Sequence, residues 1–387
     1  MGNTPNIRFK GFTDDWEQRK FSDVVEIGSG MDYKHLGEGD IPVYGTGGYM
    51  LSVDSALSEE KDAIGIGRKG TIDKPYILRA PFWTVDTLFY CIPKENHDLD
   101  FINCLFQTVD WKKKDESTGV PSLSKVIINN VEAVVPSFDE QKKIGEYFNN
   151  LDHLITLHQR KCDEMKKMKK FMLQKMFPKN GQKNPEIRFD GFTDDWEQRK
   201  LSEFGEATGG TSIESEFSAD GIYKVISIGS YSEDNIYRDQ GIRAVRSDKT
   251  INRILNKGDI TMILNDKTAS GNIIGRVLLI EESGVYVYNQ RTERIEVGCE
   301  NYNSQFIYTM LNAPEIRDKI IKQSQGNTQI YVNWTTVSQT DYLVPQIEEQ
   351  IKIGEYFKSI DNLITLHQRK VENLKNLKKY MLQNMFV

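Results

Sequence analysis

Two long segments of the chain place apolar or intermediate residues alternately four and three positions apart. Spacing of this kind, sustained over many turns, is typical of the seam of a coiled coil, and it predicts one uninterrupted helix at 139–177 and another at 348–387. Pro136 lies just before the first segment, where a helix can begin. The seam positions are Ile144, Phe148, Leu151, Ile155, His158, Cys162, Met165 and Met172, with Lys169 as an exception, and then Ile353, Phe357, Ile360, Ile364, His367, Val371, Leu374 and Met381.

A helix of this length that packed only on its own domain would expose most of its apolar stripe. The pattern therefore favours a seam between the two helices over an ordinary amphipathic helix, although the second reading stays open. Because both helices lie in one chain, they can pair antiparallel about a pseudo-twofold axis as a rod of roughly 55 Å. His158 would then meet His367, as a polar residue that sets the register rather than as a metal or pH site. The residues expected to pair the helices are Phe148, Leu151, Ile155, His158, Phe357, Ile360, Ile364 and His367.

The chain contains one plan twice. IRFKGFTDDWEQRK at Ile7–Lys20 recurs as IRFDGFTDDWEQRK at Ile187–Lys200, with an offset of 180, and Pro136–Phe177 recurs at Pro345–Phe386, with an offset of 209. The inserts between these repeats, 21–135 and 201–344, have almost no mutual similarity. The repeated segments, which frame each insert, give both halves the same support and the same partner surface. The unlike inserts let each half contact something different. The pattern predicts a bipartite reader, that is, a protein whose two halves recognise different targets.

Both inserts have the pattern of mixed sheet with short helices, separated by glycine-rich turns. Gly65, Gly67 and Gly70 have the literal GxGxxG spacing of a dinucleotide site, but Pro75 and Pro81 prevent the helix that such a site needs. We therefore expect a tight loop that presents Arg68 and Lys69 to phosphate or guanine. The predicted strands are Ile41–Tyr44, Tyr76–Leu78, Leu88–Ile92, Ile260–Leu264, Arg276–Ile280 and Val285–Tyr288.

The charge of the chain argues against nucleic-acid binding by bulk electrostatics alone. The net charge is -6, and the first insert carries 11 basic and 18 acidic residues (11 - 18 = -7), the second 14 and 19 (14 - 19 = -5). Affinity for DNA would have to come from local basic loops, from a basic partner, or from both. Seven lysines and no acidic residue lie between Met165 and Lys183, as a phosphate contact or as a solvated helix face.

Motifs of catalysis are missing from the sequence. It contains no NPPY or DPPY methyltransferase box, no GxxxxGK[ST] loop, no HExxH and no GxSxG, and its five histidines and four cysteines lack metal-site spacing. We therefore expect no catalytic residue, no metal and no cofactor of its own. No stretch has the length of a membrane helix and the N-terminus has no apolar signal core, which predicts a cytoplasmic protein without a membrane partner.

Several motifs together resemble the specificity subunits of type I restriction-modification systems. They are the WEQRK segments ending at Lys20 and Lys200, GRKGT with FWTVDTLFY, STGVPSLSK at Ser117–Lys125, and the VPxxxEQxKIGEYF junctions at Val135 and Val344. The second half follows the same scheme at YNQRTERI and at QSQGNTQIYVNW, which departs from the STGVPSLSK form. The resemblance covers essentially the whole chain, with the duplicated helices in the expected order.

The resemblance implies an α+β fold, with two globular target-recognition domains of mixed α/β structure separated by a pair of long antiparallel coiled-coil helices. Each domain would read one half of a bipartite double-stranded DNA target. The subunit would recruit two methyltransferase subunits and two restriction/translocase subunits, through which the complex uses S-adenosylmethionine, ATP and Mg²⁺. The implied divisions are 1–138, target-recognition domain 1; 139–177, central helix; 178–186, linker; 187–347, target-recognition domain 2; and 348–387, C-terminal helix.

The candidate DNA contacts come from exposed-looking loops and from the resemblance. Residue type and loop context select Lys34, Tyr44, Arg68, Lys69, Lys74, Lys125, Arg276, Arg291 and Tyr331, and the resemblance implies contacts from Ser122, Ser124, Gln325 and Asn327 as well. Two other functions remain open: a fused single-chain restriction-modification enzyme with non-obvious catalytic motifs, and a coiled-coil scaffold that binds only protein.

Overall fold

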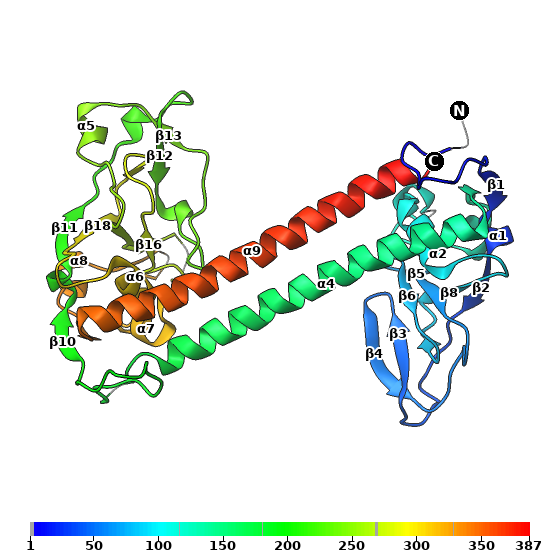
Figure 1. The fold of residues 1–387 in the computed structure, drawn as a ribbon, viewed down its shortest axis with the longest axis horizontal. Coiled ribbons are helices and arrows are strands. Elements are labelled where there is room, and N and C mark those ends of the chain that lie inside the picture. Colours follow the sequence, from blue (N-terminus) through cyan, green and yellow to red (C-terminus); the bar gives the residue numbers. More distant parts are fainter. Residues whose placement is uncertain (1–3, 116, 180, 268–269, 328) are drawn as a thin grey trace. The chain divides into compact units, whose positions relative to one another are not determined.

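A computed structural model describes residues 4–115, 117–179, 181–267, 270–327 and 329–387 of the chain (Figure 1). The structure divides into two compact units, Met1–Arg160 with His367–Val387, and Lys161–Leu366. Two long helices, α4 (Phe138–Lys175) and α9 (Ile347–Met385), each contribute one part to each unit. The first unit is therefore made of two separate pieces of the sequence, whereas the second unit is one continuous piece.

The first unit is built around a four-stranded antiparallel sheet in the order β2-β8-β5-β6, whose strand β5 is buried along its whole length. A three-stranded sheet, β4-β3-β7, and the pair β1-β9 complete the unit. The elements are β1 (Glu17–Lys20), α1 (Phe21–Val24), β2 (Val25–Ser29), β3 (Ile41–Gly45), β4 (Gly48–Val53), β5 (Ala63–Gly67), β6 (Tyr76–Leu78), β7 (Trp83–Thr84), β8 (Leu88–Pro93), α2 (Leu99–Thr108), η1 (Trp111–Lys114), α3 (Lys125–Asn129) and β9 (Glu132–Val135).

The second unit has a sheet in the order β11-β18-β14-β16, a second sheet β13-β12-β17, and the pairs β15-β19 and β10-β20. The six strands that the sequence predicted in the two inserts are all present, with ends that differ by at most a residue or so. The elements are β10 (Glu197–Lys200), η2 (Leu201–Glu203), β11 (Gly205–Gly209), η3 (Glu214–Glu216), β12 (Tyr223–Ile226), η4 (Ile228–Ser230), β13 (Arg243–Ala244), α5 (Asp248–Ile251), β14 (Ile260–Ile263), β15 (Asn265–Asp266), β16 (Val277–Leu279), β17 (Tyr286–Tyr288), β18 (Thr292–Val297), α6 (Ser304–Asn312), α7 (Pro314–Ile321), β19 (Ile330–Tyr331), α8 (Trp334–Val337) and β20 (Asp341–Val344).

The end of one long helix completes the core of each unit. In the first unit Phe386, just beyond α9, stacks on Phe101 of α2 at 5.4 Å between ring centroids and meets the edge of Trp16 at 6.2 Å. In the second unit Phe177, just beyond α4, makes the equivalent contacts with Phe306 at 5.8 Å and Trp196 at 6.1 Å. Each core thus buries aromatic rings from segments far apart in the sequence.

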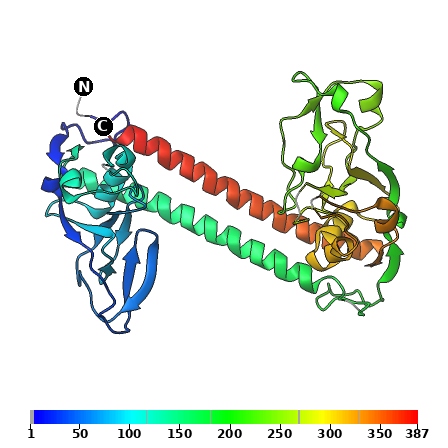
Figure 2. The same cartoon turned by 180° about the vertical axis from the view of Figure 1, so that it is seen from behind.

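Within each unit the parts of α4 and α9 run antiparallel, as both cartoon views show (Figures 1 and 2). In the first unit Lys378 Nζ lies 2.7 Å from Asp152 Oδ1, and His158 Nδ1 lies 3.0 Å from His367 Nδ1. The predicted proximity of the two histidines is confirmed. In the second unit Lys169 Nζ lies 2.6 Å from Asp361 Oδ1, so the residue that interrupts the apolar seam is paired across it. The equivalent Lys378 and Asp152 pair in the same way.

The predicted pairing positions divide between the two units. Phe148 and Leu151 are buried in the core of the first unit, where Ile155 is half-buried. Phe357, Ile360 and Ile364 are buried in the core of the second unit against the end of α4. The apolar positions that were predicted to pair the helices therefore contribute to the cores of both units. The pseudo-twofold axis stays a prediction.

A polar frame fixes the start of each long helix. The guanidinium of Arg8 donates to both carboxylate oxygens of Glu140, which is 1% exposed. Arg188 and Glu349, which is also 1% exposed, form the same pair in the second unit. The hydrogen bond to the buried carboxylate raises the pKa of each arginine.

The glycine inside each long helix has a steric cause. A Cβ atom at Gly145 would lie 2.3 Å from Asp98 Oδ1, the side chain that caps α2, and one at Gly354 would lie 2.8 Å from Asn303 Oδ1, which caps α6. Each long helix therefore crosses the start of a shorter helix at a distance that only glycine allows.

We expect Arg8→Ala to destabilise the first unit by about 3 kcal/mol, because it leaves the buried Glu140 carboxylate without its charged partner. Arg188→Ala should do the same in the second unit, and the transition measured by chemical denaturation should report both losses. Arg19→Ala is the matched control, since its pair with Glu17 is exposed and should contribute less than about 1 kcal/mol. Equal stability of the Arg8 and Arg19 variants would contradict this account.

Candidate nucleic-acid interface

Three loops of the first unit meet at the end of β5. The loop after β5 is held by its backbone, since Arg68 N donates to Thr87 O at 2.8 Å and Leu123 N donates to Arg68 O at 2.9 Å. Lys69 forms a bridge with Ser122, and a Cβ on Gly70 would lie 4.0 Å from Thr46 Oγ1 in the β3–β4 turn. The loop therefore touches both neighbouring loops.

The glycine spacing in this region serves the loop and not a nucleotide. A Cβ on Gly67 would lie 2.0 Å from Thr71 O, so the chain turns back on itself there, and Gly70 has a φ of +90°. The residues that follow run to β6 without a helix. The predicted tight loop without a following helix is confirmed.

Arg68 and Lys69 are both exposed at the end of this loop. The Arg68 guanidinium lies over the Phe89 ring at 5.9 Å, and its Nη1 atom lies 3.4 Å from Asp86 O. These contacts orient the side chain while most of its donors face outward. The pair presents two positive charges on a rigid turn, an arrangement suited to phosphate or to the acceptor edge of guanine.

The three neighbouring candidates have structural partners. Ser124 Oγ accepts from Ile127 N and caps α3, and Lys125 Nζ donates to Ile27 O at 2.8 Å. Ser122 N donates to Asp115 Oδ1 at 2.9 Å, and backbone hydrogen bonds from Ser122 and Ser117 lower the pKa of Asp115. These bonds hold both side chains in place, while the Ser124 hydroxyl proton and the remaining donors of Lys125 are still available to DNA. Their positions support the loop of Arg68 and Lys69.

The other candidates of the first unit lie in two loops and on β3 of the sheet β4-β3-β7. Lys34 is exposed in the loop after β2, and Lys74 is exposed in the loop before β6. Tyr44 is half-buried on β3, with its ring centroid 6.4 Å from that of Tyr49 and 6.2 Å from that of Tyr76. Tyr44 thus belongs to a small aromatic cluster beside the β3–β4 turn.

The second unit repeats the backbone of the first site with other side chains. Leu264 N donates to Arg291 O and Val332 N donates to Leu264 O, both at 2.9 Å, in the pattern of Arg68 with Thr87 and Leu123. Asn265 pairs with Tyr331 as Lys69 pairs with Ser122. The positions of Arg68 and Lys69 are therefore taken by Leu264 and Asn265, which the sequence analysis missed. No sequence signal marks them, because the residue types differ.

The structure brings several second-unit candidates together. Gln325 and Tyr331 exchange backbone hydrogen bonds of 2.9 and 3.0 Å, and the Tyr331 hydroxyl lies 3.2 Å from Gln325 Oε1. Asn327 is exposed in the turn between them, and Arg291 is exposed with a φ of +70°. Because Arg291 O accepts from Leu264 N, next to Asn265, these residues share one edge of the unit.

Arg276 differs from the other candidates because it is half-buried and bound to the protein. Its Nε atom donates to Asn272 O at 2.9 Å, and its Nη1 atom is hydrogen-bonded to Asn235 Oδ1. Burial lowers the pKa of Arg276, and the nearby acidic residues Glu233 and Asp234 oppose that shift. Its visible role is to hold the loop after η4 against the sheet.

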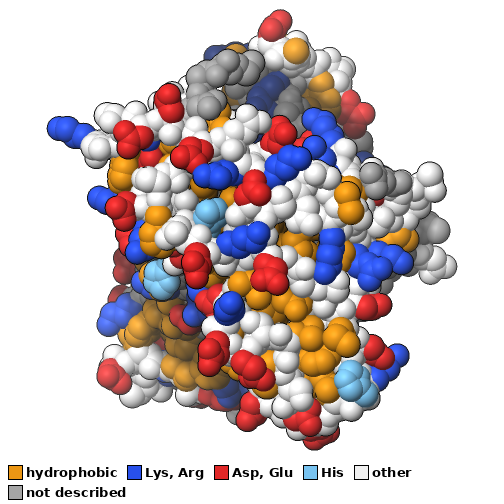
Figure 3. Space-filling model, turned by 90° about the vertical axis from the view of Figure 1, so that its right-hand side faces the viewer, with side chains coloured by type: hydrophobic (Ala, Val, Ile, Leu, Met, Phe, Trp, Pro, Cys, Tyr) orange, Lys and Arg blue, Asp and Glu red, His pale blue; other side chains and the backbone are white. Residues whose placement is uncertain are grey.

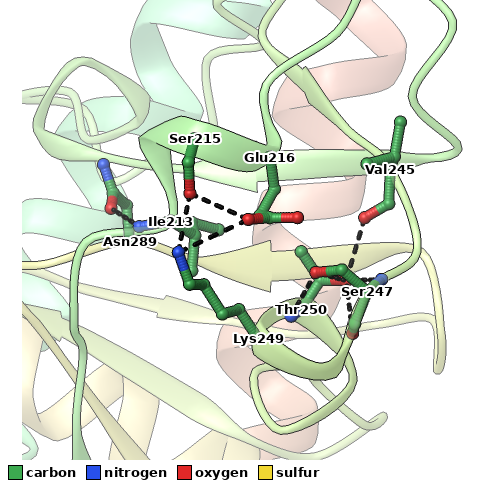
Figure 4. A network of polar contacts seen from close by, with 8 residues as sticks. All are labelled: Ile213, Ser215, Glu216, Val245, Ser247, Lys249, Thr250 and Asn289. Carbon is green, nitrogen blue, oxygen red and sulfur yellow. Dashed lines mark hydrogen bonds and ion pairs between the residues drawn. The ribbon is translucent and has the colours of Figure 1, made fainter.

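The outer lobe of the second unit, which contains β12, β13 and α5, is tied by a polar network (Figure 4). Lys249 Nζ lies 2.8 Å from Ser215 Oγ and 3.5 Å from Glu216 Oε1, while Thr250 Oγ1 donates to Val245 O at 2.9 Å. The hydrogen bond from Ser215 is the largest of the effects that lower the pKa of Glu216. The lysine charge is thus already partnered within the lobe.

Buried polar groups also lie inside the second unit. Burial raises the pKa of Glu293, on β18, to about 7, and the charge of Arg253 opposes this shift. Arg253 donates to Gly209 O and to the Tyr288 hydroxyl. The Arg253 hydrogen bonds tie the segment after α5 to β11 and β17.

The lysine-rich segment after Met165 is largely paired within the protein. Lys169 contacts Asp361, Lys175 and Lys179 both contact Glu186, and Lys183 contacts Asp195. Hydrogen bonds from Lys175 and Lys179 lower the pKa of Glu186 to about 2. Four of the seven lysines therefore have acidic partners, which favours a solvated face over a phosphate contact.

Among the described residues, no three His, Cys, Asp or Glu side chains are grouped so that they could hold a metal ion. In the same part of the chain no helix has the length and apolar character to cross a membrane.

The chain matches a family model over both of its repeated halves. The model describes the type I restriction modification DNA specificity domain and matches residues 13–167 and 193–376. The structure has two units on a duplicated helical frame, and each unit has a loop edge with exposed polar side chains. This is the architecture of a DNA-specificity protein. The chain belongs to this family, which confirms the resemblance seen in its motifs.

Individual relatives agree with the family. The chain is 28% identical over 276 residues to the type I restriction enzyme MjaVIII specificity subunit of Methanocaldococcus jannaschii, a match that covers 69% of this chain and 64% of that subunit. The crystal structure of a type I restriction-modification S subunit from M. genitalium has the same fold, with a TM-score of 0.72, 13% identity and 99% of each chain covered. A chain from a structural study of type I complex assembly and conformational transition matches with a TM-score of 0.50 and 12% identity, over 95% of this chain and 96% of that one.

We expect Arg68→Ala with Lys69→Ala to weaken DNA binding by about tenfold or more and to reduce the slope of log K against log salt concentration by about 2, because two phosphate contacts are lost. Fluorescence anisotropy over a salt series measures both quantities. Lys125→Ala is the comparison: it should lower the thermal midpoint by removing the bond to Ile27 O and leave the salt slope unchanged. If only Lys125→Ala lowered the salt slope, the phosphate contact would belong to Lys125 and not to Arg68 and Lys69.

Proposed function

We propose that this chain is the sequence-specific DNA-recognition subunit of a type I restriction-modification complex. Each target-recognition domain reads one half of a bipartite target on double-stranded DNA. The observation that carries the proposal is the family match over both halves, whose frames repeat while their inserts differ. A shared frame with unlike loop edges suits two different half-sites.

The proposed subunit has no chemistry of its own. The complex uses S-adenosylmethionine, ATP and Mg²⁺ through two methyltransferase and two restriction/translocase subunits. The acidic charge of the chain supports this division, because an acidic subunit gains affinity for DNA when a basic partner closes around the duplex. We propose that the long helices set the number of unread base pairs between the half-sites.

The long helices offer a surface for the methyltransferase subunits. Large apolar side chains are exposed on α4 and α9 at positions that directly precede positions of the seam. In an antiparallel helix pair, such positions on both helices border the same face. Each position recurs in the other helix with the offset of 209. The first unit thereby exposes Leu154, Leu157, Leu377 and Tyr380, and the second exposes Leu363, Leu366, Met168 and Phe171.

These two groups occupy equivalent positions, one group in each unit, and we propose that each forms an apolar patch. Exposed apolar side chains that recur with a fixed register on a helix pair are typical of a site where partner helices dock. Two equivalent patches on one chain support a complex with two methyltransferase subunits. The patches differ only in Met168 and Phe171, which stand where the first unit has Leu377 and Tyr380.

Exchange of residues 21–135 for the corresponding insert of another family member should change one half of the methylated target and leave the other half and the gap unchanged. The physical reason is that each insert carries its own loop edge on a common frame. Genome-wide methylation mapping in cells that carry the chain and its methyltransferase measures the result. An unchanged map would favour a protein-binding scaffold, and methylation by the pure chain would favour a fused enzyme.

We expect Leu363→Asp with Leu366→Asp to remove one of two bound methyltransferase subunits, since a charge in the patch must be desolvated on docking. Size-exclusion chromatography with light scattering gives the stoichiometry. Ile222→Asp is the control, because Ile222 is 67% exposed directly before β12 of the same unit and is not part of α9. Adding Leu154→Asp and Leu377→Asp should abolish binding. Two bound subunits on the fourfold variant would contradict the patch assignment.

A further inference from the structure

The β3–β4 hairpin of the first unit contains a bulge next to its turn. Val43 pairs with Leu51 and Tyr44 pairs with Tyr49, so Met50 has no partner on the opposite strand. A bulge breaks the alternation of side chains between the two faces of a hairpin and redirects those beside it. As a result two consecutive large side chains are exposed, Tyr49 to 63% and Met50 to 49%.

The protein holds this turn in a defined position. The Tyr76 hydroxyl donates to Gly45 O at 2.6 Å, and Val85 N donates to Tyr44 O at 3.0 Å. Met50 lies against Gly45, where a Cβ would come within 2.8 Å of its sulfur atom. The Tyr49 ring meets the edge of the Tyr44 ring at 6.4 Å between centroids. The two exposed side chains thus stand on a braced support.

The turn adjoins the basic loop. A Cβ on Gly70 would lie 4.0 Å from Thr46 Oγ1, and Gly70 follows directly after Lys69. The same edge of the unit therefore presents two cations and, beside them, two large apolar or aromatic side chains. Figure 3 shows basic and acidic side chains interspersed over one side of the protein, with apolar side chains gathered in its lower part, the level at which Figure 1 places β3 and β4.

This combination matches the two kinds of contact that a duplex requires. Cations beside a groove bind phosphates and set the register, but they carry no sequence information. Sequence is read at base edges, where an apolar side chain can contact the C5-methyl group of thymine and a tyrosine hydroxyl can bond a base. Within the described part of the chain, neither Arg68 nor Lys69 forms an ion pair with an acidic side chain, so both charges are available to the phosphates of a duplex.

We propose that the tip of the β3–β4 hairpin enters a groove of the DNA duplex, where Tyr49 and Met50 contact base edges and make the hairpin a specificity element of the first unit. This inference rests on the proposed function. Arg68 and Lys69 hold the flanking phosphates, and the bulge at Met50 points both side chains toward the bases. The second unit has a sheet of the same order, β13-β12-β17, but its residues differ from those of this hairpin, which suits a different half-site.

The test uses the full chain in complex with its methyltransferase. Tyr49→Ala with Met50→Ala should relax one or two base positions in one half of the methylated target, with the other half and the gap unchanged. Affinity for the original target should fall about tenfold, the loss expected for one base contact, while affinity for unrelated DNA and the salt slope stay the same. Methylation mapping and competition binding measure these effects.

Two further variants separate this inference from the proposed function. Arg68→Ala with Lys69→Ala should weaken binding to all sequences alike, and Tyr49→Phe with Met50→Leu should keep most of the original specificity. An unchanged target and affinity for the alanine pair, when the basic-loop variant does weaken binding, would overturn the hairpin inference and leave the function intact. Failure of the unmodified complex to bind DNA would overturn both.

Discussion

Each unit of this protein depends on an apolar seam between helix segments far apart in the sequence. The first unit needs residues 367–387 beside 138–160, because Phe386 and Met385 fill its core next to Trp16 and Phe101. The second unit needs the end of α4 in the same way, through Phe177 and Cys162. Burial of these side chains forces both helices to form and to pair antiparallel within each unit.

Polar groups then fix the start of each long helix against its unit. The buried Arg8–Glu140 pair and its counterpart Arg188–Glu349 anchor the first turns, and a glycine lets each helix cross the capped start of α2 or α6. Removal of one partner from such a pair would leave an uncompensated buried charge, which costs about 3 kcal/mol or more. The residues of this frame repeat in both units, whereas the loops that the frame supports differ. Such a combination is expected of a protein that recognises two different half-sites.

Much of the fold could be predicted from the sequence, but less of the site. The helix bounds, the His158–His367 contact and the loop of Arg68 and Lys69 followed from periodicity, internal repetition and glycine–proline chemistry. Lys125, Ser124 and Arg276 bind a backbone carbonyl, a helix end and an asparagine, and nothing local in the sequence shows that these partners lie within reach. Their contacts with DNA stay a prediction. Asn265 was missed because its equivalence to Lys69 exists only in the hydrogen-bond pattern.

The sequence by itself determined the duplicated plan, the two long helices and the family, because repeats and periodic patterns are properties of residue order alone. Only the tertiary structure decided which lysines and arginines are already partnered, which strands meet at the loop edges, and that a bulge exposes Tyr49 and Met50 together. The physical reason is that a side chain's partners come from distant segments, and their distances are set by packing and not by spacing along the chain.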